Sequence, residues 1–198
     1  MGKKASLVQQ RQQPLRERYR SAPAEAWITD GAQTISACGE DAFHGVVVPA
    51  NGADAPVPFG IHRAVGGFHD YPNPGDLLAA ALAACFDSTL RMIADHLGIR
   101  LETLEVEVEA ECDVRGCLLV ERTVRVGFQR MRCGVRLQTK DPVDEETIKM
   151  LLGAAEHSCV VMQTLRNGVA VQTQVETGNA AAAIAAARHD VRGSMPSP

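Results

Sequence analysis

The sequence has few aromatic residues, little net charge and no long run of apolar residues. Aromatic side chains make up 4% of the 198 residues, and the formal net charge of -4 is spread along the chain. Without a basic stripe or a row of stacking aromatic side chains, nothing favours nucleic-acid binding. The longest apolar stretch, Leu77 to Phe86, is about half of the roughly 20 residues that a membrane span needs. We therefore predict no nucleic-acid and no membrane partner.

The N-terminus also lacks the apolar segment of a secretory signal. Its basic and polar stretches are Met1 to Lys4 and Gln9 to Gln13. We therefore expect a cytoplasmic protein. Thiols are kept reduced in the cytoplasm, and the chain is long enough to fold without disulfides. The spacing of the cysteines does not fit a zinc site. The six cysteines are Cys38, Cys85, Cys112, Cys117, Cys133 and Cys159.

One domain is expected, because a hydrophobic content of 45% is enough for a single sizeable core. Residues 1–25 are predicted to form an N-terminal arm or short helix, and residues 26–176 the domain. Residues 177–198 are predicted to form an alanine-rich helix, over Asn179 to Arg188, followed by a loose tail.

The first part of the domain favours short strands. A small antiparallel meander is predicted over Trp27–Thr29, Gln33–Ser36 and Phe43–Val48. A loop rich in proline and glycine follows over residues 49–74 and leads into the main helix. Such a long loop in a compact domain is often functional.

The main helix carries a cysteine in its most apolar stretch. It is predicted over residues 74–96, with Asn73 as N-cap, Pro74 in the first position and Asp76 in the first turn. A rotation of 100° per residue predicts that Cys85 lies on the packed side of this helix. The other residues predicted on that side are Leu78, Ala81, Leu82, Thr89, Met92 and Ile93.

Strict alternation of apolar residues and glutamates predicts a strand over Leu104–Cys112, with the glutamates in solvent and Cys112 in the core. A turn at Asp113–Gly116 and a partner strand over Leu118–Phe128 are predicted to complete a hairpin, and another strand is expected near Val135–Thr139. These elements predict antiparallel sheets in an α+β fold.

A second amphipathic helix is predicted to begin with Asp141 as N-cap and Pro142 as first helical residue. Cys159 lies just beyond its end, and Val169–Val175 is predicted as a last strand. The apolar face of the helix consists of Ile148, Leu151, Leu152 and Ala155.

Three segments carry a resemblance to a known family. They are Asn73–Cys85, Ala155–Cys159 and Gln163–Val169. In these segments, and in the order of its predicted elements over residues 26–176, the chain resembles the OsmC/Ohr family of organic hydroperoxide reductases. The resemblance implies an OsmC-like α+β fold with antiparallel sheets and central cysteine-bearing helices, built as an intertwined homodimer.

The resemblance also implies a thiol-dependent peroxidase. Cys85 would attack an organic hydroperoxide as thiolate and become a sulfenic acid. Cys159 would resolve it to a disulfide, which a dithiol reductant reopens. No metal, haem, flavin or other cofactor is required.

A buried thiol needs a nearby positive charge or several hydrogen-bond donors to ionise near neutral pH. In the family an arginine supplies this charge, and a carboxylate near the start of the cysteine helix holds the arginine. Arg63, in the loop before the helix, is predicted in this role ahead of Arg18 and Arg20. Asp76 is the nearest carboxylate and is predicted to hold it.

Two positions depart from the family pattern and indicate a divergent member. Gly75 stands where the family has a glutamate, and Val160 follows the second cysteine where the family commonly has a proline. The alternative function is therefore a non-catalytic relative that binds a small apolar ligand or a thiol partner in the same cleft.

Structural roles compete with the functional ones. A cysteine on an apolar helix face usually packs, and Asp76 can simply stabilise the helix N-terminus. Surface or capping roles compete with thiolate tuning for His62, His69 and His157. The other four cysteines, Cys38, Cys112, Cys117 and Cys133, are interpreted as structural.

Overall fold

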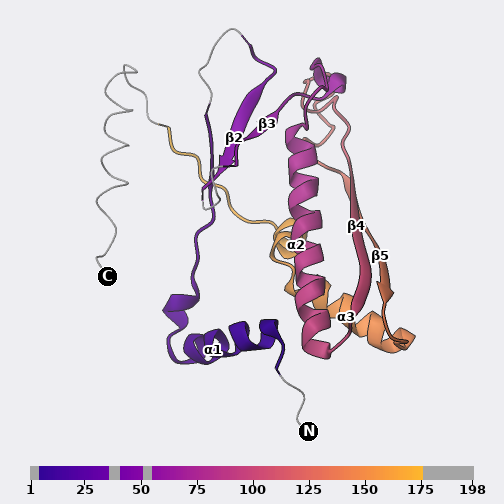
Figure 1. Cartoon of the computed structure of the whole chain (residues 1–198). Helices are drawn as coiled ribbons and strands as arrows, with labels where there is room; N and C mark the ends of the chain where they lie inside the picture. The colour runs from indigo at the N-terminus through magenta and orange to yellow at the C-terminus, as the bar shows by residue number, and fades with distance from the viewer. Residues whose placement is uncertain (1–4, 36–40, 51–54, 176–198) are drawn as a thin grey trace. The chain divides into compact units, whose positions relative to one another are not determined.

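The structure, a computed structural model, describes residues 5–35, 41–50 and 55–175 (Figure 1). The contacts divide the chain into two units, Met1–Asn167 and Gly168–Pro198. The regular elements of the first unit are α1 (Leu7–Ser21), a 3-10 turn (Pro23–Ala26), β1 (Ala32–Thr34), β2 (Gly45–Pro49), β3 (Val57–Phe59), a 3-10 turn (Arg63–Val65), α2 (Pro74–Leu97), β4 (Leu101–Glu111), β5 (Arg130–Thr139), α3 (Glu145–Ser158) and α4 (Val160–Asn167).

The central helix α2 forms where the sequence predicts it. Asn73 caps its N-terminus by accepting the amides of Gly75 and Asp76, and Asp76 accepts the Asn73 amide in return. At the other end Gly98 takes a left-handed conformation with φ of 73°, which a residue without Cβ adopts at little cost. The predicted N-cap is therefore confirmed, and the helix ends at Leu97, one residue beyond the predicted end.

The buried stripe of α2 is rotated from the predicted one. Its core residues are Leu82, Phe86, Thr89, Leu90 and Ala94. Leu78, Ala81 and Met92, predicted on the packed side, are exposed, so that part of the prediction is wrong for the single chain. The cause is tertiary: α2 packs on β4, α3 and α4, and these elements select the Phe86 side.

β4 and β5 form a long antiparallel hairpin that runs alongside α2 (Figure 1). Its inward side chains, including Leu104, Val106 and Val135, pack against the core residues of the helices. On the outer face Glu105, Glu107, Glu109 and Glu111 form ion pairs with Arg130, Arg132 and Arg136 of β5. The predicted solvent-facing glutamate ladder is thus confirmed, and exposed pairs of this kind each contribute little stability.

The predicted partner strand over residues 118–128 is wrong. This segment forms successive turns, and β5 takes the place opposite β4, with Leu104 opposite Leu137 and Glu111 opposite Arg130. Leu119 has a φ of 58°, which is incompatible with a strand. Pairing ends at Glu111, so Cys112 lies beyond β4 and is exposed rather than in the core.

α3 begins later than predicted. Its N-cap is Asp144, whose carboxylate accepts the Thr147 amide at 2.8 Å, and not Asp141. The Asp141 carboxylate instead pairs with the Arg100 guanidinium at 2.7 Å. Both aspartates satisfy the local signal for an N-cap, and in the structure Asp141 pairs with Arg100, directly before β4, while Asp144 caps the helix.

The helix α4 was not predicted, and it follows α3 after a single residue, Cys159. Beyond it, residues 168–175 of the second unit contain neither helix nor strand, so the predicted strand over Val169–Val175 is not formed. Val169, Val171 and Val175 are exposed, and nothing within that unit's described residues offers them a sheet to join. The predicted alanine-rich helix and tail lie outside the described residues.

A small antiparallel sheet in the order β1-β2-β3 precedes α2. The predicted small antiparallel meander is thus confirmed, but the strands that form it differ in part from the predicted ones. Trp27–Thr29 forms no strand, and β3 lies in the stretch that was predicted as loop. Part of the predicted strand over Gln33–Ser36 and the residue Cys38 fall outside the described residues.

The arm before this sheet is helical and contacts the C-terminal half of α2. Ser6 of its capping box donates a hydrogen bond to Asp95, and the Gln12 amide lies 3.3 Å from the Met92 sulfur. The ring of His96 completes the contact, with its Nε2 2.7 Å from the Gln12 amide oxygen. The predicted arm thus contacts Met92, one of the exposed apolar residues of α2.

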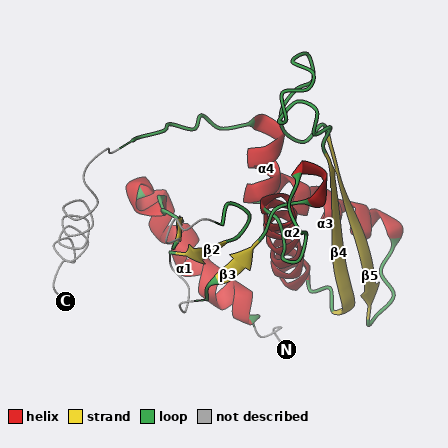
Figure 2. Cartoon of the chain, turned by 90° about the horizontal axis from the view of Figure 1, so that it is seen from above, coloured by secondary structure: helices red, strands yellow, loops and turns green. Residues whose placement is uncertain are grey.

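Among the described residues, α2 is the one helix long and apolar enough to cross a membrane. Core helices of soluble proteins pass the same test, so this is weak evidence. Five of its residues pack into the core, and Asp87 and Arg91 form an ion pair on its surface, which favours the predicted role as a core helix. Figure 2 shows the β4–β5 hairpin alongside this helix.

His44 ties the start of β2 to the loop before α2. Its Nδ1 lies 2.7 Å from the Asp41 carboxylate and its Nε2 lies 3.1 Å from the Asp70 carboxylate. Neutral imidazole has one N–H, so only the protonated ring donates to both carboxylates. Hydrogen bonds to Asp41 and then to Asp70 accordingly raise the pKa of His44 above its usual 6.5.

This link predicts a pH-dependent contribution to stability. Because the pKa of His44 is raised on folding, its contribution is fully present below the unfolded-state pKa and is lost as the pH rises through the folded-state pKa. We expect Asp70→Asn to lower the pKa of His44 and to reduce the loss of stability above about pH 6.5. An NMR titration of the ring and urea unfolding on both sides of that pH measure the two effects.

The control for this prediction is Glu102→Gln, which removes an exposed carboxylate of β4. It should leave the His44 titration as it is in the wild type. An unchanged pKa in Asp70→Asn would contradict the link.

Candidate functional site

The two predicted redox cysteines, remote in sequence, are neighbours in the structure. Cys85 lies half-buried in the middle of α2, and Cys159 is fully buried at the junction of α3 and α4. Cys85 packs against the core that contains Cys159 and contributes to raising the pKa of the Cys159 thiol, so the two thiols are close neighbours. Neither is in a disulfide. The fold therefore assembles a dithiol from two packed helical elements.

The surroundings of Cys159 act on the pKa of its thiol in opposite directions. Burial raises the pKa of its thiol, and the hydrogen bond to Cys85 and a negative charge there raise it further. The backbone amides of Val161 and Met162, in the first turn of α4, act in the opposite direction. The effect of burial is the largest, so the pKa of the Cys159 thiol is raised overall.

The predicted charge partners of Cys85 are Arg63 and Asp76. Arg63 is exposed on the 3-10 turn before α2, and no hydrogen bond or ion pair within the described chain joins it to Cys85 or Asp76. The Asp76 carboxylate is 2.9 Å from the Asn73 amide that it caps. Its structural role at the helix N-terminus is visible, and its role in holding an arginine stays a prediction.

Gly75 permits a close contact at the start of α2. A Cβ at this position would lie 2.9 Å from the Asn73 Oδ1 and 2.9 Å from the Cζ of Phe128. A larger residue would therefore require the Phe128 ring to move. The aromatic ring occupies the space into which a glutamate side chain would extend.

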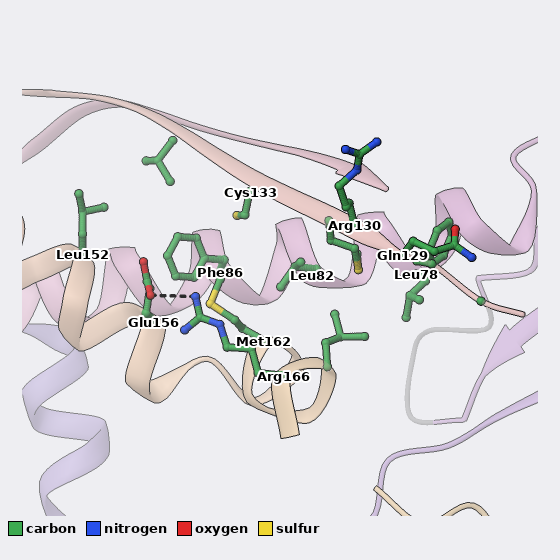
Figure 3. Close-up of a pocket in the computed structure, with 15 residues that line it drawn as sticks. Leu78, Leu82, Phe86, Gln129, Arg130, Cys133, Leu152, Glu156, Met162 and Arg166 are labelled. Carbon is green, nitrogen blue, oxygen red and sulfur yellow. Dashed lines mark hydrogen bonds and ion pairs between the residues drawn. The ribbon is translucent and has the colours of Figure 1, made fainter. Parts of the chain in front are cut away.

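A cavity of about 770 Å³ lies between the Phe86 side of α2, the strand β5 and the helices α3 and α4 (Figure 3). Neither Cys85 nor Cys159 is among its lining residues. Leu82, Phe86 and Met162 contribute apolar walls, and the ion pair of Glu156 and Arg166 supplies the polar part. Its remaining lining residues are Leu78, Gly127, Phe128, Gln129, Arg130, Met131, Cys133, Val135, Leu152 and Leu165.

The one cysteine among the lining residues of this cavity is Cys133 of β5. Its pKa is raised, first by burial and then by the negative charge of Glu156, against the opposing effect of Arg166. Sequence reasoning interpreted Cys133 as structural, and its place on an inward strand position agrees with packing. The charge pair beside it carried no sequence signal, because its members come from two different helices.

The remaining predicted residues lie away from the dithiol or in ordinary roles. Cys112 and Cys117 are exposed, and Cys117 donates to the Val114 carbonyl oxygen. His62 caps the 3-10 turn by accepting the Ala64 amide and contacts the His69 ring. His157 is exposed in the last turn of α3. Among the described residues no group of three His, Cys, Asp or Glu could hold a metal ion.

Comparison with known proteins now settles the family. The profile of the family described as OsmC-like protein matches residues 67–174, more than half of the chain. The chain belongs to the OsmC-like protein family. The matched region includes α2, the β4–β5 hairpin and both helices that flank Cys159, and the resemblance predicted from the two cysteine motifs is confirmed. No curated protein matches the sequence.

Solved OsmC-like structures share the fold at low identity. An OsmC-like protein from Mycoplasma pneumoniae is 15% identical with a TM-score of 0.57, over 71% of this chain and 89% of that chain. An organic hydroperoxide resistance protein from Elizabethkingia anophelis, with bound thiocyanate, is 23% identical with a TM-score of 0.53, over 73% and 92%. An organic hydroperoxide resistance protein from Legionella pneumophila is 23% identical with a TM-score of 0.50, over 74% and 96%. The mixed α/β fold with antiparallel sheets is thus confirmed.

The environments of the thiols predict an order of alkylation. Cys112 and Cys117 are exposed and should react with iodoacetamide first. Cys133 and Cys159 should react last, because both are shielded and the pKa of each is raised. Peptide mass spectrometry over a time course measures the order. Alkylation of Cys159 as fast as that of Cys112 would show that the dithiol is not buried.

Proposed function

We propose that the protein is a cytoplasmic thiol-dependent peroxidase that reduces organic hydroperoxides. The single observation that carries the proposal is that Cys85 and Cys159 are close neighbours in the core of a chain of the OsmC-like family. Solved relatives of the same fold carry the name organic hydroperoxide resistance protein, which supports a peroxide as substrate. No cofactor is needed, because sulfur supplies both electrons.

In the first step the Cys85 thiolate attacks the terminal oxygen of the hydroperoxide. The O–O bond breaks, the alkoxide takes a proton and leaves as the alcohol, and Cys85 becomes a sulfenic acid. Cys85 is assigned this step because it is half-buried, whereas Cys159 is fully buried with a raised pKa. Arg63 is proposed to favour the thiolate, and Asp76 to hold Arg63.

In the second step the Cys159 sulfur attacks the sulfenic sulfur of Cys85, and the S–O bond breaks with release of water. A dithiol reductant then attacks the disulfide at Cys85, the more accessible sulfur. Cys159 leaves as thiolate, which the Val161 and Met162 amides stabilise, and the second thiol of the reductant releases Cys85.

We further propose an intertwined homodimer. The exposed apolar residues Leu78 and Ala81 share one side of α2 with Cys85, and Val169, Val171 and Val175 alternate in an exposed segment with strand-like sequence. A second subunit would cover such surfaces, since uncovered apolar side chains favour association. Analytical ultracentrifugation measures this state.

The second candidate function is a non-catalytic relative that binds a small apolar ligand. The cavity at Phe86 favours it, because apolar walls with one polar pair suit such a ligand. The contact of Phe128 with Gly75 favours the binding function as well, because the Phe128 ring occupies space where the family has a glutamate side chain at the start of the cysteine helix.

A thiol count separates the two functions. One equivalent of tert-butyl hydroperoxide should remove two free thiols from the reduced wild type, because one is oxidised and the second closes the disulfide. Cys85→Ser should lose none, and Cys159→Ser should lose one, as a sulfenic acid that dimedone traps. The matched control Cys112→Ser should behave as the wild type. Retention of all thiols in the wild type would favour the binding function.

The role of Arg63 has its own test. Arg63→Gln should slow the first step about tenfold or more near neutral pH, because each unit of increase in the thiol pKa lowers the thiolate fraction about tenfold. The rate should recover as the pH is raised. Stopped-flow measurement of peroxide consumption gives both values. Arg122→Gln, which removes another exposed arginine, is the control, and an unaltered rate in Arg63→Gln would exclude Arg63.

A further inference from the structure

Cys159 occupies a one-residue break between two helices. It has extended backbone angles, with φ of -74° and ψ of 108°, whereas α3 ends at Ser158 and α4 begins at Val160. Helical hydrogen bonds continue on both sides, from the Cys159 amide to the Ala155 carbonyl and from the Gln163 amide to the Cys159 carbonyl, each at 2.9 Å. The direction of the thiol therefore depends on the angle between the two helices.

Two side-chain contacts cross this break and meet at one residue, Glu156. The Arg166 Nη2 lies 2.9 Å from the Glu156 Oε2, as Figure 3 shows. The Gln163 side-chain amide donates to the Glu156 backbone carbonyl at 2.7 Å. Both contacts fasten the last turn of α3 to the body of α4. Cys159 lies between their attachment points in the sequence.

α4 needs such contacts because it is short. It has eight residues, of which Met162 is the one buried, and helices of this length are marginal without tertiary support. The amides of Val161 and Met162 that face the Cys159 sulfur belong to its first turn. A change in the position of α4 therefore changes both the hydrogen bonding and the direction of the thiol.

We propose that Glu156 and Arg166 are positioning residues, which hold the α3–α4 break so that the Cys159 thiol stays against Cys85 for disulfide closure. The inference rests on the proposed function for its place in a reaction. Their side chains are 48% and 52% exposed, so the pair contributes little to the free energy of unfolding. Its effect is on geometry, since a small displacement of a reacting atom costs much of the rate of an intramolecular step.

The test separates the two chemical steps in Arg166→Gln, in a Cys133→Ser background. That background is needed because Arg166 also affects the pKa of Cys133. After one equivalent of tert-butyl hydroperoxide, the first thiol should be lost at the rate of the Cys133→Ser parent. Closure to the disulfide should be slower by about tenfold or more, and dimedone should trap more sulfenic acid.

Rescue shows whether the ion pair itself matters. The double variant Glu156→Arg with Arg166→Glu restores an attraction across the break and should recover most of the closure rate. Arg166→Lys keeps the charge and should lose less than Arg166→Gln. Lys149→Gln removes another exposed ion pair of α3, with Glu145, and should close at the parental rate. If Arg166→Gln does not fold, Glu156→Gln gives the same comparison and retains the Gln163 contact to the backbone.

Closure at the parental rate in the folded variant would overturn the proposal. Failure of the proposed function is distinguished by diamide, which oxidises neighbouring thiols without a peroxide. If the wild type closes the disulfide with diamide and does not react with the peroxide, the peroxidase is wrong, and the diamide rates still test the positioning. If Arg166→Gln closes with diamide as fast as its parent, the positioning is wrong whatever the peroxide result.

Discussion

The contact of the Cys85 and Cys159 thiols depends on the packing of α2 against the α3–α4 pair. Leu82, Phe86 and Leu90 form one side of that packing, and Leu151 and Ala155 form the other. Because protein interiors are close-packed, these residues determine how the helices lie against one another. The thiols meet as a consequence of hydrophobic burial, with no covalent bond between them.

The same burial creates a chemical conflict at Cys159. A sealed thiol is protected from unwanted oxidation, but removal from water disfavours its thiolate. The first-turn amides of α4 partly compensate, because they point at the sulfur where the helix begins. The break between α3 and α4 is therefore more than a connection. The Cys159 amide makes the last helical hydrogen bond of α3, to Ala155, and the Cys159 side chain lies at the first-turn amides of α4.

The sequence predicted well those elements whose signals are local. Asn73 and Gly98 mark the ends of α2, and alternating glutamates mark β4, since capping and solvent exposure need only neighbours along the chain. It failed where two local signals competed. Asp141 and Asp144 both carry the N-cap signal, and the segment over 118–128 alternates as a strand would, but the strand that pairs with β4 is β5.

For the candidate site, the sequence by itself identified the two cysteines and their family motifs, because each motif is a short continuous segment of the chain. Only the tertiary structure decided that their thiols touch, that Phe128 fills the space at Gly75, and that Glu156 pairs with Arg166 across Cys159. Each of these contacts joins residues whose separation is set by helix packing, and packing depends on the shapes of all the core side chains together rather than on any one stretch of sequence.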